Sequence, residues 1–363
     1  MVGIDRRLLQ NVDWPLLGAA VGLVILSAST LASLHVGRAG GVVAVRQLAW
    51  FGVGMMALVV VASIDYRRLV QMAPLLYLMG LGTLVAVFVL GRTVSGARRW
   101  LLIGPLSVQP SELFKICFVL MAVWLLTSRW AQPLGKITLA MAALLAAVPA
   151  VLILKQPDLG TALLLFPVLM ALLVAAGIPL RLLGGLVLAG LAATPLAWFV
   201  LKDYQRERIL VFLDPFRDPL GSAYNVIQAK IAIGSGQLLG KGVAGATQSR
   251  LAFLPERHTD FIFAVFAETW GFVGCLVLLS CYALLLLRGF DIAAQTREPV
   301  GRLVALGVTS LVAVQVLVNV GMVTGLLPVV GIPLPFMSYG GSSMVVSLTA
   351  LGLLLSVRMR QFQ

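Results

Sequence analysis

Long runs of apolar residues repeat along almost the whole chain. An α-helix rises 1.5 Å per residue, so about 20 apolar residues cross the hydrocarbon core of a bilayer. Runs of this kind occupy residues 14–36, 47–64, 69–91, 137–154, 159–180, 182–201 and 261–287. A shorter run lies at 113–127, and prolines and glycines divide the uncharged stretch 303–357 into two further spans. The pattern predicts an all-α membrane protein of about ten transmembrane helices, forming one domain over residues 1–363.

Composition agrees with a chain that has the bilayer as its solvent. Hydrophobic residues make up 60% of the sequence and charged residues 11%, against about 25% charged in a soluble domain. The first apolar run is too long for a signal peptide, so we expect it to be retained. The net charge of +13 is attributed to anionic lipids and an anionic lipid-linked substrate rather than to nucleic acid. The three cysteines lie in predicted spans without paired spacing and are expected to be packing residues.

Basic residues predict the orientation of the chain. With ten spans both termini lie on one side. Arg6 and Arg7, Arg67 and Arg68, Arg129 and Lys136, Arg297 and Arg302, and Arg358 and Arg360 fall on that side. By the positive-inside rule it is the cytoplasmic side. The connections 92–110 and 202–259 are then outside, although both carry basic residues that the rule alone does not explain.

The connection 202–259, between the seventh and eighth spans, is too long and too apolar for an ordinary loop. Tyr224, Ile227 and Ile231 follow helical spacing within residues 223–233, which predicts a helix at the membrane surface. The connection 325–341 is rich in proline and glycine and almost free of charge. Backbone of that kind is stable at membrane depth only when it is packed in protein or lines a watery cavity. The chemistry is therefore expected on the outer face.

Ionisable residues within spans cost about 2.5–3.5 kcal/mol each at a helix centre, so they are functional candidates. They are Glu112, Lys115, Asp158, Asp260 and Glu268. Glu112 and Lys115 share a helical face, so they either form a structural ion pair or act at a site where Lys115 pairs with Asp158 or Asp260. Asp158 and Asp260 could each serve only as a helix N-cap. Spacing alone leaves these alternatives open.

Four motifs resemble those of a known family. They are QPSE at 109–112 with Lys115, QPDLG at 156–160, FLPERHTDFIFA at 253–264 and IPLPFMSYGG at 332–341. In type and order they resemble the SEDS proteins (shape, elongation, division and sporulation), over most of the chain. Arg257 and the run NVGMV at 319–323 are similar to the members of the family that act in cell elongation rather than in division.

The resemblance implies a peptidoglycan glycosyltransferase of the bacterial cytoplasmic membrane. Such an enzyme polymerises lipid II, the undecaprenyl-pyrophosphate-linked disaccharide-pentapeptide, on the outer face. Asp260 matches the essential aspartate of the family. The resemblance further implies a class B penicillin-binding protein as partner, bound through its transmembrane helix, together with other proteins of the elongation complex.

The chemistry of the residues agrees with this activity. A sugar pyrophosphate has a good leaving group, so one carboxylate, Asp260, is enough as the general base. The leaving pyrophosphate needs positive charge, and Glu112 and Asp158 lie near the predicted outer ends of their helices beside several cations. The candidate cations are Arg99, Lys115, Lys230, Lys241, Arg250 and Arg257. Mg²⁺ or Mn²⁺ bridged by Glu256 and Asp260 is a further hypothesis.

Two other functions fit a polytopic chain with internal charges. A lipid II flippase would also place polar residues inside a bundle of helices. Transporters often contain inverted repeats with a site at the midplane, whereas this chain has no clear repeat and its charges gather toward one face. A scaffold for wall synthesis is the third reading, and it gives no reason for an aspartate and several cations to gather on one side.

Overall fold

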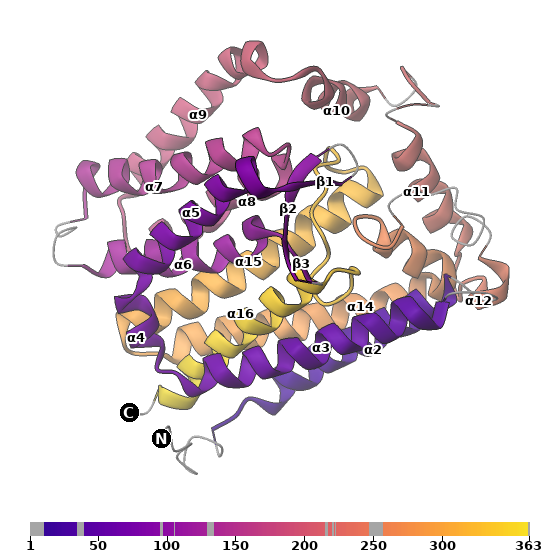
Figure 1. Cartoon of the computed structure of the whole chain (residues 1–363), viewed down its shortest axis with the longest axis horizontal. Coiled ribbons are helices and arrows are strands. Elements are labelled where there is room, and N and C mark those ends of the chain that lie inside the picture. Colours follow the sequence, from indigo (N-terminus) through magenta and orange to yellow (C-terminus); the bar gives the residue numbers. More distant parts are fainter. Residues whose placement is uncertain are drawn as a thin grey trace.

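Figure 1 shows a bundle of long helices, crossed at one end by shorter helices and strands. The computed structural model describes residues 11–34, 40–94, 97–104, 106–128, 134–214, 217–219, 221, 223–246 and 257–361. Eight helices in these ranges are long and apolar enough to cross a membrane. They are α2 (Trp14–Ser33), α3 (Gly40–Ser63), α5 (Ala73–Leu90), α6 (Pro110–Thr127), α7 (Lys136–Lys155), α14 (Ile262–Gln295), α15 (Pro299–Thr324) and α16 (Gly341–Arg360).

Two further helices are apolar, the shorter α8 (Leu159–Ala175) and α9 (Leu180–Val200), whose apolar part is residues 180–192. Together with the eight they match the ten predicted spans, and the mostly helical membrane fold is confirmed. The stretch 303–357 is divided as predicted, because α15 ends at a left-handed glycine, Gly325, and α16 begins at Gly341.

The centre of the bundle consists of α6, α15 and α16, most of whose residues are buried. Helix α16 packs against α3, and α14 packs against both α15 and α2. Helix α6 contacts α5, α8 and α15. The peripheral helices expose many large apolar side chains, as expected where lipid tails cover them. The central helices therefore carry the buried polar residues that could do chemistry.

The connection 92–110 is not a plain loop, although the fold as a whole is mostly helical as predicted. Its strands β1 (Arg92–Val94), β2 (Ala97–Ile103) and β3 (Leu106–Val108) form a small antiparallel sheet in the order β1-β2-β3. Arg98, Trp100 and Leu102 alternate with their neighbours along the chain, and this period of two is compatible with a strand. The sheet lies just before α6 and places Arg99 near the outer end of the bundle.

The long segment after α9 folds into α10 (Asp203–Leu213), α11 (Tyr224–Ser235) and the short α12 (Gly242–Gly245). Helix α11 confirms the helix predicted at 223–233, and α10 was not predicted. The predicted basic residue Arg250 lies outside the described residues. In Figure 1 these helices lie at the end of the bundle away from the labelled chain ends.

Helix α14 is broken at Gly271, which has φ 67° and ψ −166°. The turn before α12 fills this break. The N–H of Phe272 donates to the carbonyl of Gln237 at 2.8 Å, and that of Val273 donates to Leu238 at 3.1 Å. A Cβ atom on Gly271 would lie 2.2 Å from the backbone nitrogen of Gly240, so only glycine fits. These two bonds join the second part of α14 to the turn before α12, and the N–H of Lys241 joins the first part to it by donating to the carbonyl of Glu268 at 3.0 Å.

Both ends of the described chain lie on the same side of the bundle. The carboxylate of Asp13, which caps α2 by accepting from the N–H of Leu16 at 3.0 Å, lies 2.6 Å from Arg288. Arg358, near the end of α16, lies 3.8 Å from the same carboxylate. Chain ends on the same side of the bundle require an even number of spans, in agreement with the predicted ten.

Candidate functional site

Asp260 lies in the turn that precedes α14, at the end of the bundle that bears the outer segment. The N-cap position of α14 is Phe261, which makes no side-chain capping bond, so Asp260 is not the cap that spacing allowed. The side-chain amide of Asn319 on α15 donates to the carbonyl of Asp260 at 2.9 Å. A Cβ atom on Gly331 would lie 3.2 Å from Oδ2 of Asp260. The carboxylate therefore rests directly on the backbone of Gly331.

The connection between α15 and α16 holds this turn in place. The N–H of Tyr339 donates to the carbonyl of His258 at 2.8 Å, and the hydroxyl of Ser338 donates to the carbonyl of Thr259 at 2.6 Å. The N–H of Leu334 in turn donates to the Ser338 hydroxyl at 2.7 Å. Residues 330–339 are thus packed in protein, as predicted, and they form the support on which the Asp260 turn rests.

Asp158 is the N-cap of α8 and also part of a polar cluster. Its Oδ1 accepts from the N–H of Thr161 at 3.2 Å, which confirms the capping role that spacing allowed. Its Oδ2 accepts from the Ser111 hydroxyl at 3.0 Å and from the Gln109 side-chain amide at 3.2 Å. Asp158 is 3% exposed, so its charge depends on these donors. The motifs at 109–112 and 156–160 therefore meet in space.

The loop 330–332 lies between the start of α8 and Asp260. A Cβ atom on Gly160 would lie 2.8 Å from the carbonyl oxygen of Val330 and 2.7 Å from the side chain of Ile332. The side-chain amide of Asn319 also donates to the carbonyl of Ile332 at 2.7 Å. Three of the four sequence motifs thus converge on one loop.

Glu112 and Lys115 form an ion pair inside α6, with Nζ 2.8 Å from Oε1. The two residues are 2% and 1% exposed. Of the alternatives that spacing left open, the structure shows the ion pair within α6, and the described residues include no ion pair of Lys115 with Asp158 or Asp260. Each charge compensates the other inside the bundle, beside the Asp158 cluster, so removal of one partner would leave the other buried and unpaired.

Sequence reasoning missed Arg208, on the face of α10 that points inward. Burial lowers the pKa of Arg208, and the nearby negative charges of Asp260 and Asp158 partly oppose this effect. Burial also raises the pKa of Tyr204, on which Arg99, Arg208 and Asp158 act electrostatically. These five charged or polar groups therefore share one neighbourhood. The pattern that could have indicated Arg208 is the helical spacing of Tyr204, Arg208 and Val211, in a stretch for which no helix was predicted.

The other predicted cations are distributed differently. Arg99 on β2 has a buried Nε without a hydrogen-bond partner among the described residues, and it lies in the Arg208 neighbourhood. Lys241 lies 3.9 Å from the buried Glu268, about two helical turns along α14 from Asp260. Burial lowers the pKa of Arg257, in the turn before Asp260. Lys230 lies against Gly325, where a Cβ atom would be 2.5 Å from its Nζ.

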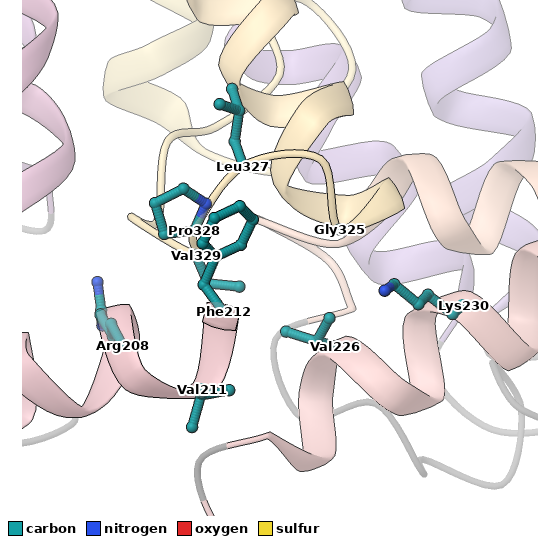
Figure 2. A pocket seen from close by; sticks show the side chains of 9 residues that line it. All are labelled: Arg208, Val211, Phe212, Val226, Lys230, Gly325, Leu327, Pro328 and Val329. Carbon is teal, nitrogen blue, oxygen red and sulfur yellow. The ribbon is translucent and has the colours of Figure 1, made fainter. Parts of the chain in front are cut away.

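A pocket opens beside this neighbourhood, between α10, α11 and the chain that follows α15 (Figure 2). It is a shallow pocket with a cavity volume of about 30 Å³ that opens to solvent. Its lining residues are Arg208, Val211, Phe212, Val226, Lys230, Gly325, Leu327, Pro328 and Val329. Figure 2 shows Arg208 and Lys230 on opposite sides, with apolar side chains between them.

The predicted metal site cannot be assembled from the described residues. Glu256, its second ligand, lies outside them. Among the residues that the structure describes, no three His, Cys, Asp or Glu side chains are grouped as a metal site requires. The Mg²⁺ or Mn²⁺ hypothesis stays a prediction.

Known proteins share both the sequence and the fold. The chain matches the family described as "Cell cycle protein" (FtsW, RodA, SpoVE) over residues 10–363. It is 45% identical over 313 residues to the peptidoglycan glycosyltransferase MrdB of Escherichia coli K12, covering 86% of this chain and 84% of the relative.

Two solved structures extend the likeness to three dimensions. One, described as "Structural coordination of polymerization and crosslinking by a peptidoglycan synthase complex", contains a chain 36% identical, with a TM-score of 0.81 and coverage of 97% and 99%. The crystal structure of the rod shape-determining protein RodA of Thermus thermophilus is 34% identical, with a TM-score of 0.73 and coverage of 97% and 98%. In sequence and in fold, the chain belongs to the SEDS family of FtsW, RodA and SpoVE cell cycle proteins.

Proposed function

We propose that this chain is a peptidoglycan glycosyltransferase that polymerises lipid II into β-1,4-linked strands for cell elongation, with Asp260 as its general base. The relative in Escherichia coli bears the name of that activity, at 45% identity. The single observation that carries the role of Asp260 is the way in which neighbouring residues hold it in place. The buried amide of Asn319 holds the backbone carbonyl of Asp260, its carboxylate lies against Gly331, and the charge of this carboxylate acts on the partly buried Arg208.

The reaction needs a base and a place for negative charge. Asp260 removes the proton from the 4-hydroxyl of the acceptor GlcNAc while that oxygen attacks the anomeric carbon of the donor. The bond from this carbon to the pyrophosphate oxygen breaks, and undecaprenyl pyrophosphate leaves with the electron pair. Direct displacement from an α-linked donor gives a β link. Base catalysis of this kind typically contributes about 10²–10⁴ in rate.

The remaining candidates take different parts in this proposal. Arg99 and Arg208 are the cations that face Asp260 and suit a leaving phosphate. The Asp158 cluster, with its amide and hydroxyl donors, suits sugar hydroxyls. Glu112 and Lys115 support substrate binding from α6, next to that cluster. Arg257 supports it from the turn that carries Asp260. Lys241 belongs to the support of α14 through Glu268.

The test is strand synthesis by the purified chain from purified lipid II, without another glycosyltransferase. Strands from the parent chain exclude a flippase or a scaffold as the whole function. Asp260→Asn keeps the shape of the residue but removes the proton acceptor, so we expect turnover to fall by about 10² or more with folding retained. Asp203→Asn, at a fully exposed carboxylate on α10, is the matched control and should leave turnover unchanged. Near-parent turnover in folded Asp260→Asn protein would refute the assignment.

The partner and the orientation follow from the same proposal. A class B penicillin-binding protein would bind through its transmembrane helix, and its addition should raise strand synthesis. The related solved complex couples polymerisation to crosslinking.

In the bacterial cytoplasmic membrane both termini would be cytoplasmic and residues 202–259 outside. In a variant without native cysteines, Gln237→Cys should react with a membrane-impermeant reagent only from outside. Labelling only from the cytoplasm would reverse the orientation.

A further inference from the structure

A second pocket lies at the end of the bundle that bears the chain termini (Figure 1). It is formed where α14 ends at Gln295, α15 begins at Pro299 and α16 ends at Arg360, next to the short helix α4 (Tyr66–Gln71). Its cavity volume is about 530 Å³, and it opens to solvent. Asp260 lies at the other end of the bundle, so this pocket is separate from the site assigned to the reaction.

Positive charge is in excess in this pocket. Three arginines and one acid line it, namely Arg67, Arg297, Arg360 and Glu298. The Glu298 carboxylate accepts from Nε of Arg67 at 2.9 and 3.1 Å and from the hydroxyl of Tyr66, so it compensates Arg67. In the part of the chain that the structure describes, neither Arg297 nor Arg360 forms an ion pair with a carboxylate. Two positive charges are therefore left for a ligand.

The two remaining arginines are held differently. Arg360 is 6% exposed and donates only to neutral groups, which are the carbonyls of Ala62 and Ser63 and the carbonyl and hydroxyl of Ser356. Its guanidinium is thus fixed, and it acts on a ligand through its charge. Arg297 is exposed, in the connection 296–298, so its side chain can turn toward a ligand. A fixed charge beside an accessible guanidinium favours an anion with oxygen acceptors.

The side chain of Gln361, which also lines the pocket, is the second sign of a ligand. Both its Nε2 and its Oε1 are buried, and neither has a hydrogen-bond partner among the described residues. Buried polar atoms without a partner cost free energy, so a ligand that pairs with them gains from this. Because an amide presents a donor and an acceptor, the ligand that suits it has an acceptor and a donor as well.

The pocket lies at the depth of lipid head groups. Helix α16 has 20 residues and ends at Arg360, and at 1.5 Å per residue this length is about the thickness of the hydrocarbon core. Residues at its end therefore lie where the hydrocarbon gives way to phosphates, which are concentrated at this depth. A phosphate that also carries hydroxyl groups matches both the cations and Gln361.

We propose that this pocket binds a phosphoglycerol group. Arg297 contacts the phosphate, and Arg360 adds positive charge. Gln361 donates to a phosphate oxygen through Nε2 and accepts from a glycerol hydroxyl through Oε1. The head group of an anionic phospholipid and soluble glycerol phosphate both present these atoms. The bound group joins the connection between α14 and α15 to the end of α16, and the proposal does not depend on the glycosyltransferase function.

The experiment follows binding through the stability of the full chain. Dioctanoyl phosphatidylglycerol, dioctanoyl phosphatidylcholine and glycerol 3-phosphate are each titrated into the purified chain in detergent, and the melting temperature is recorded. A ligand that binds only the folded chain raises this temperature. We expect phosphatidylglycerol to raise it saturably, and less at high salt, whereas phosphatidylcholine should leave it nearly unchanged.

Variants locate the binding. Arg297→Gln and Gln361→Leu should each weaken phosphatidylglycerol binding about fivefold or more. Without ligand, Gln361→Leu should not lower the melting temperature, because its amide has no partner to lose. Arg302→Gln removes an exposed arginine of α15 at the same end of the bundle that does not line the pocket, and binding should stay within about twofold of the parent.

The two probes separate the sources of the group. A response to glycerol 3-phosphate as well as to phosphatidylglycerol shows that the pocket takes the soluble form, and a response to the lipid alone shows that it takes the head group. The proposal is wrong if neither probe binds the parent, if phosphatidylcholine binds equally, or if Arg297→Gln and Gln361→Leu both bind like the parent. It is also wrong if a glutamate hexapeptide binds in place of both probes, since the pocket then receives an acidic protein segment.

Discussion

The side-chain amide of Asn319 donates to the carbonyl of Asp260 at 2.9 Å, although the two residues lie 59 positions apart in the sequence. The same nitrogen donates to the carbonyl of Ile332 at 2.7 Å. Asn319 is fully buried, so no water replaces these bonds if they are lost. One side chain of the central helix α15 thus sets the relative position of the catalytic turn and its supporting loop.

Replacement of Asn319 by leucine should therefore lower turnover. Asn319→Leu keeps the volume but leaves two buried carbonyls without a donor, so we expect about 1–3 kcal/mol of lost stability. It should lower kcat at least tenfold with little change in KM, because Asn319 positions the base and does not touch the substrate. Thr324→Val, on the same helix, removes only hydroxyl bonds to the carbonyls of Val320 and Gly321 within α15 and should leave kcat unchanged. Equal kcat in both variants would contradict a positioning role.

A methyl group on Gly331 should disturb the base directly. Gly331→Ala introduces a Cβ atom 3.2 Å from Oδ2 of Asp260 at a residue with φ 75°. Gly177 is a matched control, since it has φ 86° and open space around its Cβ position. Both variants should lose about 1 kcal/mol of stability from backbone strain. Only Gly331→Ala should also lose activity, and an equal activity of the two enzymes would show that the contact is unimportant.

The Glu112–Lys115 pair can be tested by removing one charge and then both. Lys115→Met leaves a buried, unpaired carboxylate and should cost about 3–5 kcal/mol of stability. The double variant with Glu112→Gln should regain most of that loss, measured by thermal melting in detergent. Strand synthesis separates the two roles. Recovery of both stability and turnover in the double variant indicates a structural pair, whereas recovery of stability alone indicates that Lys115 also serves the substrate.

Alkaline pH should weaken the end of the bundle that bears the chain termini. The hydroxyl of Tyr66 donates to Oε2 of Glu298, and burial together with this bond holds the pKa of Tyr66 well above its ordinary value. The phenol therefore stays protonated in the folded chain but ionises near pH 10 in the unfolded chain. Its contribution is present below that pH and is lost as pH rises further. Tyr66→Phe should show a shallower fall of melting temperature above pH 10, and identical slopes would contradict this.

Much of the fold could be predicted because the bilayer imposes a length on every apolar run. The helices α2, α5 and α7 match their runs within a few residues, since little besides hydrophobicity decides them. The sheet β1-β2-β3 and the helix α10 could not be predicted in this way. Outside the bilayer their form depends on contacts with the bundle, and a polar stretch such as 203–213 lacks a strong apolar period.

Several residues of the candidate site were predicted, but the contacts between them were not. Asp260 and the Asp158 motif were identified from local patterns that fold as expected. The partner of Lys115 was left open because a helix neighbour, Glu112, competes with residues distant in sequence, and only packing decides between them. Arg208 was missed for a related reason. Its importance comes from the charge of Asp260, 52 positions later in the sequence, and no local pattern records that proximity.

The break at Gly271 has a mechanical consequence. Residues 262–270, which follow Asp260 directly, are separated from the remainder of α14 by the break, and the N–H of Lys241 joins them to the segment after α11 by donating to the carbonyl of Glu268 at 3.0 Å. The turn that carries Asp260 is therefore linked through this short helix to the surface segment that follows α11. A force applied to that surface by any bound molecule reaches Asp260 through nine residues of helix.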